Sequence, residues 1–380
     1  MTVMTSIRSY AISFFCLFTL LPCCAQLARY SLDFSLSKKD FVDSIDISYR
    51  NGQVLVPVII GDKEYRFLLD TGAGQAVVYS DRPIEGCQPA GRIISHDAVG
   101  HSDTVSMVTL PPMTIGSTVY SGCQATLQRR AVAHGNIDGI IGFDLVCKGL
   151  SMKIDVRQHL LVLTDRRRFF DREPGFSTRY RLNYHVPYID VSPFAHFTRP
   201  ALFDTGSRQL YSMNRQHFDE AEQQLQQIVA VQTEGRQQGR HAMGHQGAEA
   251  SSEVVFLALS RLQIGGFGFD DVHAITTLGD SHVGARLLEY GAVVLCPRRR
   301  KFIFQPYEGE HHVVVSNPQL PISFVIERGQ TVVGLVWERG PAYKAGFRTG
   351  DVVLHHYVDG TYILRDADGN EKTVKYSNRP

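Results

Sequence analysis

The sequence has almost no excess charge and none of the common cofactor motifs. Its 380 residues carry a formal net charge of +1, which gives no electrostatic basis for binding nucleic acid or an anionic membrane surface. It contains no P-loop, no dinucleotide-binding fingerprint and no zinc-type spacing of Cys and His. We therefore expect no cofactor, no metal ion and no nucleic-acid partner.

Long apolar runs are also scarce. One run, residues 11–21, follows Arg8 and precedes small residues that fit cleavage before Gln26. This pattern is typical of a signal peptide, here residues 1–25, and the run is too short to span a bilayer comfortably. We expect an exported protein, periplasmic or extracellular, with no integral membrane segment after cleavage. Lipid attachment at Cys24 is an alternative with a poor recognition sequence.

Cysteines are few. Cleavage would leave four: Cys87, Cys123, Cys147 and Cys296. In an exported protein these permit disulfides with three possible full pairings, and free buried cysteines fit the pattern equally well. They are too sparse for a disulfide framework. The core, in a chain with 43% hydrophobic residues, must therefore provide most of the stability.

Long helical periodicity is scarce too, and the pattern favours β-structure. Short stretches rich in β-branched or apolar residues, bounded by Gly, Pro or Asp, predict strands. They are residues 54–60, 65–69, 105–110, 160–163 and 254–259. The best helix candidate is residues 216–231. Residues 232–252, rich in Gly, Gln and His, are predicted to form a mobile loop.

The sequence does contain a repeat. The triplet Asp-Thr-Gly occurs at residues 70–72 and again at 204–206, each time after a short apolar run. A single copy is common turn chemistry, in which the Asp is a solvated turn residue. Two copies with matching surroundings indicate a duplication that could bring two carboxylates together.

The segments downstream of the two triplets also align. From residues 141 and 283 onward they match without gaps at a constant offset of 142 positions, which places Gly149 on Gly291. This match is independent of the triplets themselves. It predicts two homologous lobes, at about residues 26–165 and 180–308.

These motifs resemble the aspartic protease superfamily, which includes pepsins and retropepsins. The resemblance rests on Asp-Thr-Gly followed, tens of residues later, by an apolar-apolar-Gly triplet, which is residues 140–142 in the first lobe. The second lobe keeps Val283 and Gly284 of that triplet and has drifted before them. The resemblance covers most of the mature chain. It implies a mainly β, bilobal, acid-protease-like β-barrel fold.

The resemblance also implies a chemistry. Asp70 and Asp204 would face each other across the lobe interface, and two close carboxylates cannot both ionise cheaply, so one keeps a proton. The pair would activate a water to hydrolyse a peptide bond, with no covalent intermediate. This predicts an aspartic endopeptidase with a polypeptide substrate and a monomeric catalytic unit. The alternative is a catalytically inactive protein that binds peptides in the same cleft and through a C-terminal module.

Neighbours of the two aspartates are expected to support the pair. They are Thr71, Gly72, Thr205, Gly206 and Ser207. By resemblance, the threonine hydroxyls bond to the opposite loop, and the glycines let the backbone approach the carboxylates. Ser207 could donate to the outer oxygen of Asp204, whereas Ala73 offers no hydroxyl to Asp70. This asymmetry predicts a less acidic pH optimum than that of a site with a hydroxyl on both sides.

Family members close a hairpin over the substrate, and two Gly-His pairs lie where such tips are expected. These residues are Gly100, His101, Gly244 and His245. We expect them to form flaps, with exposed loop histidines as the alternative.

The C-terminal residues 320–380 differ in pattern. Residues 340–347, Gly-Pro-Ala-Tyr-Lys-Ala-Gly-Phe, and the Gly-Asp at 350–351 resemble the PDZ signature of bacterial exported proteases, with Pro341 and Phe347 as departures. Only a hairpin is expected afterwards, so the helix that forms one wall of a PDZ peptide groove is missing. Peptide capture by strand addition is therefore in doubt. A structural cap on the second lobe and a peptide-binding domain both remain open.

Overall fold

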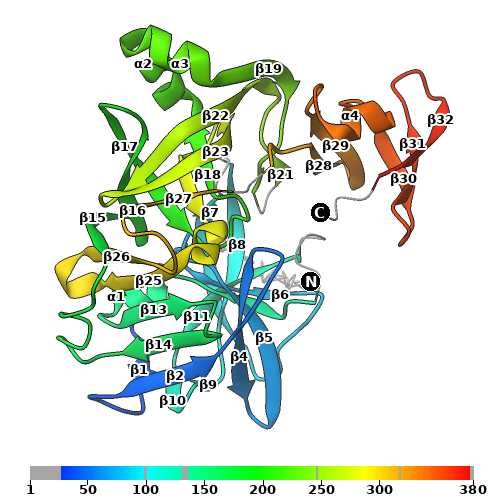
Figure 1. The fold of residues 1–380 in the computed structure, drawn as a ribbon. Coiled ribbons are helices and arrows are strands. Elements are labelled where there is room, and N and C mark those ends of the chain that lie inside the picture. The colour runs from blue at the N-terminus through cyan, green and yellow to red at the C-terminus, as the bar shows by residue number, and fades with distance from the viewer. Residues whose placement is uncertain (1–26, 98–100, 131–135, 245–246, 316–317, 377–380) are drawn as a thin grey trace, which may run out of the picture.

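The computed structural model describes residues 27–97, 101–130, 136–244, 247–315 and 318–376 (Figure 1). The predicted signal peptide and its cleavage site lie outside these ranges. As predicted, the fold is mainly β. None of the helices in the described ranges has the length and apolar character needed to cross a membrane.

The described strands form two large sheets, a hairpin and a small C-terminal sheet. The 11-stranded sheet comprises β1 (Ser35–Leu36), β3 (Ser48–Arg50), β4 (Gln53–Ile60), β5 (Lys63–Leu69), β6 (Ala76–Tyr79), β7 (Gln88–His96), β8 (Ser102–Thr109), β9 (Met113–Ile115), β10 (Thr118–Ser121), β11 (Gln124–Gln128) and β12 (Gly139–Ile141). The 14-stranded sheet comprises β2 (Val42–Asp46), β13 (Ser151–Asp155), β14 (Leu160–Thr164), β15 (Phe176–Asn183), β16 (Val186–Phe194), β17 (Phe197–Asp204), β18 (Tyr211–Asn214), β19 (Thr233–Gly239), β22 (Ser252–Ile264), β23 (Phe267–Thr277), β24 (His282–Gly284), β25 (Gly291–Cys296), β26 (Lys301–Pro306) and β27 (His312–Val314). The hairpin is β20 (Met243–Gly244) with β21 (Gly247–Ala248), and the C-terminal sheet comprises β28 (Ile322–Glu327), β29 (Gln330–Val336), β30 (Val352–His356), β31 (Thr361–Arg365) and β32 (Glu371–Lys375).

One order of strands occurs twice. The first sheet contains the run β4-β5-β12-β6-β11-β8-β7, and the second contains β16-β17-β24-β18-β23-β22-β19. In both runs the third strand is parallel to the second strand and antiparallel to the fourth. We call the parts that carry these runs the first and second halves of the chain. The repeated order is what a duplicated unit would produce.

The two halves meet along a pair of equivalent strands. β13 pairs with β25, so that Met152 lies opposite Leu295 and Lys153 opposite Val294. In the alignment that places Gly149 on Gly291, Leu295 is the equivalent of Lys153 and Val294 is that of Met152. This reciprocal pairing is the pattern of a local two-fold axis. It supports the predicted duplication independently of the Asp-Thr-Gly triplets.

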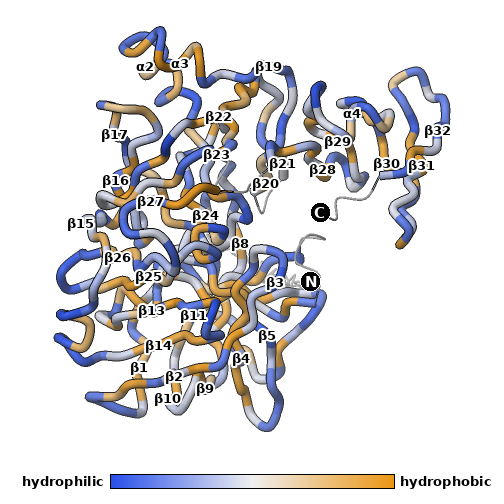
Figure 2. Tube along the Cα trace, viewed as in Figure 1, coloured by the Kyte–Doolittle hydropathy of each residue, from blue (hydrophilic) through white to orange (hydrophobic). Residues whose placement is uncertain are grey.

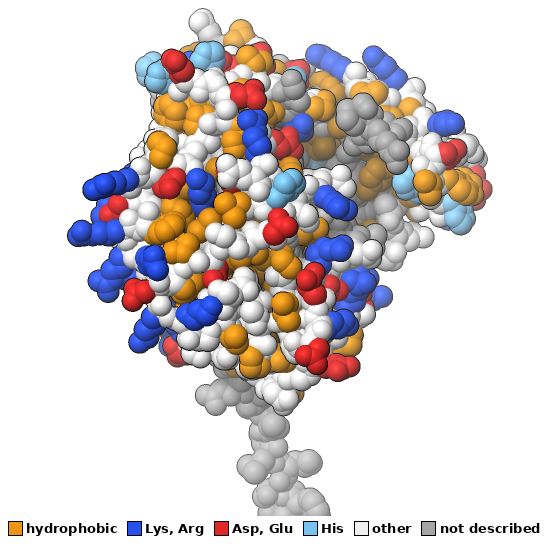
Figure 3. All heavy atoms as spheres, turned by 60° about the horizontal axis from the view of Figure 1, so that its bottom comes forward, with side chains coloured by type: hydrophobic (Ala, Val, Ile, Leu, Met, Phe, Trp, Pro, Cys, Tyr) orange, Lys and Arg blue, Asp and Glu red, His pale blue; other side chains and the backbone are white. Residues whose placement is uncertain are grey.

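Apolar side chains form a core that runs through both halves, and Figure 2 shows hydrophobic residues along the strands of both. In β4, for example, Val54, Val56 and Val58 are buried and alternate with partly exposed residues, the period-two pattern of a half-buried strand. Cys87, Cys123, Cys147 and Cys296 are all free, so burial stabilises this part of the chain without disulfides. The face shown in Figure 3 carries basic and acidic side chains in close alternation, in keeping with the small net charge.

Two sequence-based expectations about residues 216–252 need correction. The predicted helix is two helices, α2 (Arg215–Gln224) and α3 (Gln226–Gln232), because the chain bends at Leu225, where φ is −130°. The predicted loop is wrong for residues 233–239, which form β19 paired with β22. The residues of β19 have a weak intrinsic preference for strand structure. They form a strand because the edge of β22 provides backbone hydrogen-bond partners.

The C-terminal sheet, with the short helix α4 (Pro341–Ala345), docks on the second half. The ring of Trp337 stacks on Phe256, with centroids 4.2 Å apart and planes at 26°, and the Arg240 amide donates to the Gly334 carbonyl at 2.9 Å. In Figure 1 this module stands beside β19 and β21, away from β4 and β5. Within residues 318–376 no second helix follows α4, as expected. The PDZ-like assignment itself stays a prediction.

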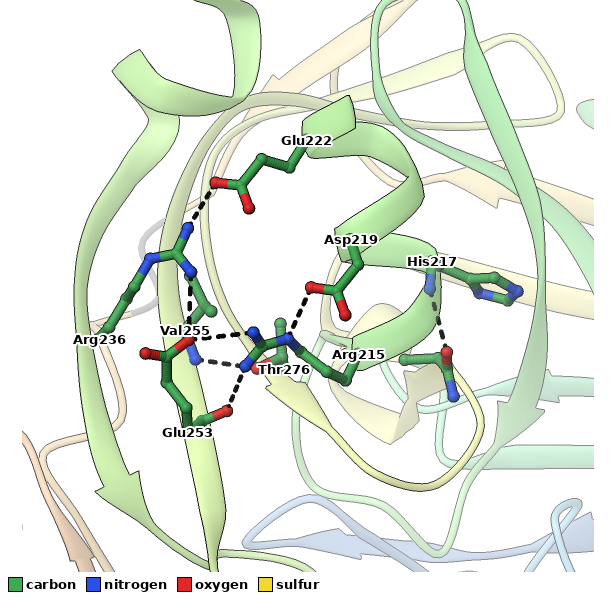
Figure 4. A network of polar contacts seen from close by, with 9 residues as sticks. Arg215, His217, Asp219, Glu222, Arg236, Glu253, Val255 and Thr276 are labelled. Carbon is green, nitrogen blue, oxygen red and sulfur yellow. Dashed lines mark hydrogen bonds and ion pairs between the residues drawn. The ribbon is translucent and has the colours of Figure 1, made fainter. Parts of the chain in front are cut away.

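An ion-pair network fixes α2 to the neighbouring strands (Figure 4). The Glu253 carboxylate accepts from Arg215 at 3.0 Å and from Arg236 at 3.1 Å. Arg215 also bonds Asp219, and Arg236 bonds Glu222. Burial alone would raise the pKa of Glu253, but the hydrogen bonds and charges of the two arginines outweigh it and lower that pKa.

We expect Glu253→Gln to destabilise the fold at neutral pH by about 1 kcal/mol, a modest value because the network is partly exposed and screened. A carboxyl whose pKa is lowered on folding contributes stability above its unfolded-state pKa, and that contribution is lost as the pH falls through the folded-state pKa. The melting temperatures of variant and wild type should therefore converge in acid. A constant difference from pH 7 down to pH 2 would contradict this account.

Candidate active site

The two Asp-Thr-Gly loops come together at the junction of the halves. Asp70 directly follows β5, and Asp204 is the last residue of β17. Their carboxyl groups face each other, since each lies against the glycine of the other loop. Asp70 Oδ1 also accepts from the amides of Gly72 (2.9 Å) and Ala73 (3.1 Å), and Asp204 Oδ1 accepts from Gly206 (2.9 Å). The pair is therefore held by backbone donors from both loops.

The threonines of the two triplets cross-link the loops. Thr71 Oγ1 donates to the Phe203 carbonyl (2.6 Å) and accepts from the Thr205 amide (3.0 Å). Reciprocally, Thr205 Oγ1 donates to the Leu69 carbonyl (2.7 Å) and accepts from the Thr71 amide (3.0 Å). Both threonines are fully buried. Neither hydroxyl is free to react, so their role is to fix the spacing of the aspartates.

Glycine is required where the loops touch. A Cβ at Gly72 would lie 2.5 Å from Cγ of Asp204, and a Cβ at Gly206 would lie 2.5 Å from Oδ2 of Asp70. Each loop therefore leaves room for the carboxylate of the other. A second pair of glycines supports the loops from behind. A Cβ at Gly142 would meet the backbone of Ala73 and Gln75, and one at Gly284 would meet the equivalent residues Ser207 and Gln209.

The electrostatics of the pair follow from burial and proximity. Burial raises the pKa of Asp70 well above its usual range, and the charge of Asp204 raises it further. Two adjacent carboxylates in such a place share one proton and titrate as a unit. Such a pair can give a proton and take one in the same step. Among the described residues, no group of three or more His, Cys, Asp or Glu side chains could hold a metal ion.

Residues 56–145 match the family model for aspartyl proteases (Asp_protease_2, Aspartyl protease). The match contains the first Asp-Thr-Gly loop and Gly142. Among solved structures, an aspartic proteinase from Irpex lacteus is similar, at 14% identity over 70% of this chain and 97% of that chain, with a TM-score of 0.45. No curated protein matches.

The second half lies outside the family match. Its relation to the first half depends on the repeated strand order. Ser207 reaches Asp204 through its backbone amide, which donates to the Asp204 carbonyl at 3.1 Å. The role expected of its hydroxyl stays a prediction. The extra amide donor from Ala73 to Asp70 was not foreseen, because backbone donors leave no mark in the sequence.

The predicted flap residues lie at hairpin tips as far as the structure describes them. His101 closes the β7–β8 hairpin, where its amide donates to Asp97 Oδ1 at 2.8 Å. Gly244 ends β20, and a Cβ there would collide with the Asp97 carboxylate. The two tips therefore touch. Gly100 and His245 lie outside the described residues, so contact with a substrate stays a prediction for all four.

His282 is the site residue that the sequence interpretation missed. It occupies the position of Ile140 in the second apolar-apolar-Gly triplet, the part of that triplet that departs from the pattern. Parallel pairing of His282 with Leu202 places its Nδ1 4.0 Å from Asp204 Oδ2, with 14% of the side chain exposed. His241 is a further titratable neighbour, and its pKa is lowered chiefly by burial and also by the charge of His282. The useful signal was the exchange of an apolar residue for a titratable one at an aligned position.

We expect Thr71→Val to destabilise the protein by about 2–6 kcal/mol, because it leaves two buried backbone groups without a hydrogen bond at roughly 1–3 kcal/mol each. Those groups are the Thr205 amide and the Phe203 carbonyl. Thr71→Ser keeps both hydrogen bonds and serves as the matched control. Chemical denaturation measures the difference. Equal stability of the Val and Ser variants would show that the cross-links contribute little.

We expect replacement of His282 to move the acid limb of the pH–rate profile to higher pH. Imidazole ordinarily carries a positive charge in acid, and a cation beside Asp204 favours the ionised form of the carboxyl pair. Without that cation the ionised form of the carboxyl pair is less favoured, so activity in acid should be lost first.

His282→Ile introduces the residue found at the equivalent position 140, and His282→Gln is a neutral polar control. Both neutral variants should show the same displacement, measured as kcat/KM against pH. An unchanged acid limb in both would rule out an electrostatic role for His282.

Proposed function

We propose that the chain is an exported aspartic endopeptidase in which Asp70 and Asp204 activate a water between them. The observation that carries the proposal is the pair of adjacent carboxyls in two loops cross-linked by Thr71 and Thr205. The aspartyl protease match over residues 56–145 supports a peptidase-like function. Export depends on the signal-peptide pattern of residues 1–25.

The proposed reaction needs no group beyond the carboxyl pair and water. The ionised carboxylate takes a proton from the water as its oxygen attacks the carbonyl carbon of the peptide bond. The protonated carboxyl donates its proton to the carbonyl oxygen, giving a neutral tetrahedral diol. Its collapse breaks the C–N bond as the protonated carboxyl donates its proton to the leaving nitrogen and the ionised carboxylate takes a proton from one hydroxyl of the diol. The pair ends with one proton, as it began.

The alternative, an inactive peptide-binding protein, has one observation in its favour. The second half has His282 in place of an apolar residue and lies outside the family match. A binding protein, however, has no need for two adjacent carboxyls that cost stability when both ionise. We therefore favour catalysis.

We further propose that the C-terminal module is a structural cap on the second half. Besides the stacked Trp337, both ends of the Gln237 amide bond its backbone, at Val336 (2.9 Å) and Glu338 (3.0 Å). Ser323 Oγ donates to the carbonyl of His241 at 3.1 Å. This docking supports a fixed module, without the helix that would complete a peptide groove.

Asp70→Asn should abolish hydrolysis of an unstructured polypeptide, with a loss of about 10²–10⁴-fold or more, because general acid–base catalysis requires the shared proton. The same change should raise the melting temperature at neutral pH. A carboxyl with a raised folded-state pKa stabilises the fold fully below its unfolded-state pKa of about 4, and this stability is lost as the pH rises through the folded-state value. Asparagine does not ionise, so the variant keeps this stability at neutral pH.

The stability difference between Asp70→Asn and wild type should therefore shrink below about pH 4, where wild-type Asp70 is protonated in both states. Asp204→Asn tests the partner in the same assay. Glu253→Gln, far from the loops in sequence and not part of their contacts, is the control for general destabilisation. Normal cleavage by both Asn variants would exclude the proposed mechanism.

A further inference from the structure

The turn between β15 and β16 has an unusual backbone for its residues. Tyr184 and His185 both adopt left-handed conformations, with φ of 48° and 68°. Two-residue hairpin turns of this kind favour Asn-Gly, Asp-Gly or Gly-Gly, because a bulky side chain is strained at positive φ. A strained turn persists only where the surrounding structure holds it.

The first half contains the same turn with suitable residues. Asn51 and Gly52 join β3 to β4 with φ of 52° and 73°. The pairs that close the two turns correspond, Arg50 with Gln53 and Asn183 with Val186. The same turn therefore occurs in both halves, with favourable residues in the first half and strained residues in the second. Local folding does not explain the choice of Tyr-His in the second half.

The position of the strained turn suggests a reason. The Tyr184 carbonyl lies against the loop of Asp70, where a Cβ at Gly74 would be 2.6 Å from that oxygen. On its other side, the Tyr184 ring lies 6.4 Å from the ring of His96, at the end of β7. The turn therefore reaches from the second half to the Asp70 loop and to the β7–β8 hairpin of the first half.

The Tyr184 side chain is also exposed to solvent. It is 82% exposed, and His96 is exposed beside it. An aromatic ring has much apolar area to bury and pairs well with other rings. A polypeptide bound across the Asp70 loop would cover this ring pair.

We propose that Tyr184, together with His96, binds a large apolar or aromatic side chain of the polypeptide substrate on the Asp70 side of the carboxyl pair. This inference rests on the proposed function. The strain of the turn is retained because it directs the tyrosine ring toward the substrate. The other explanation is a turn of purely structural importance.

Transplanting the first-half turn separates the two explanations. The double variant Tyr184→Asn with His185→Gly restores favourable turn residues, so its melting temperature should rise by a few degrees. Its KM for peptides with Phe or Leu at the contacted position should rise roughly tenfold, with kcat little changed. KM for the same peptides with Ala at that position should stay constant.

Single variants refine the measurement. Tyr184→Phe keeps the ring and should retain the wild-type KM, whereas Tyr184→Ala should reproduce the loss. The assay uses synthetic decapeptides that differ at one position, scanned over the length of the peptide. A double variant that is more stable and has unchanged KM for every peptide would overturn the proposal.

Binding distinguishes this inference from the proposed hydrolysis. The same fluorescent decapeptides are titrated into Asp204→Asn protein with and without the transplanted turn. If wild type cleaves nothing but the transplant still weakens binding of Phe-containing peptides roughly tenfold, the recognition role stands and the hydrolytic function fails. Equal binding by both proteins overturns the recognition role, whether or not wild type cleaves.

Discussion

The reciprocal hydrogen bonds of Thr71 and Thr205 are the constraint on which the rest of the structure depends. Each threonine belongs to one half of the chain, yet its hydroxyl satisfies the backbone of the other half, at Phe203 and Leu69. All four bonds lie out of water, where an unmade bond is costly. Neither aspartate loop is therefore complete without its partner. This interdependence holds two carboxyls together although their proximity opposes ionisation.

Pairing between strands of the two halves also holds the aspartate loops together, over a larger area. Pairing of β13 with β25 joins the halves through backbone hydrogen bonds, and the core continues from one half to the other. Separation of the loops would therefore require both the sheet and the core to open. The glycines at 72, 142, 206 and 284 complete the arrangement, because a side chain at any of them would collide with the opposite carboxylate or with the loop backbone.

Sequence alone predicted what local chemistry demands. Asp70, Asp204 and their threonines stood out because the triplet occurs twice, and Gly284 stood out because it aligns with Gly142. The structure gives the physical reason, since a Cβ at Gly284 would collide with the backbone of Ser207 and Gln209. Features that depend on distant partners were not predictable. β19 forms because β22 offers an edge, and the contact of Trp337 with Phe256 joins residues far apart in the chain. The position of His282 beside Asp204 became visible only in the strand pairing of the structure.

The two halves share their strand order but differ around the carboxyl pair. His282 replaces Ile140, Arg208 replaces Gly74, and Tyr184-His185 replaces Asn51-Gly52. In each case the second half has the larger or more polar side chain. Packing restrains the core positions of both halves. The positions around the carboxyl pair are less restrained, so the two halves can differ there. A peptide has a direction, and two equivalent walls could not distinguish its ends. For the proposed endopeptidase, unequal walls in one chain let a polypeptide bind in a single orientation.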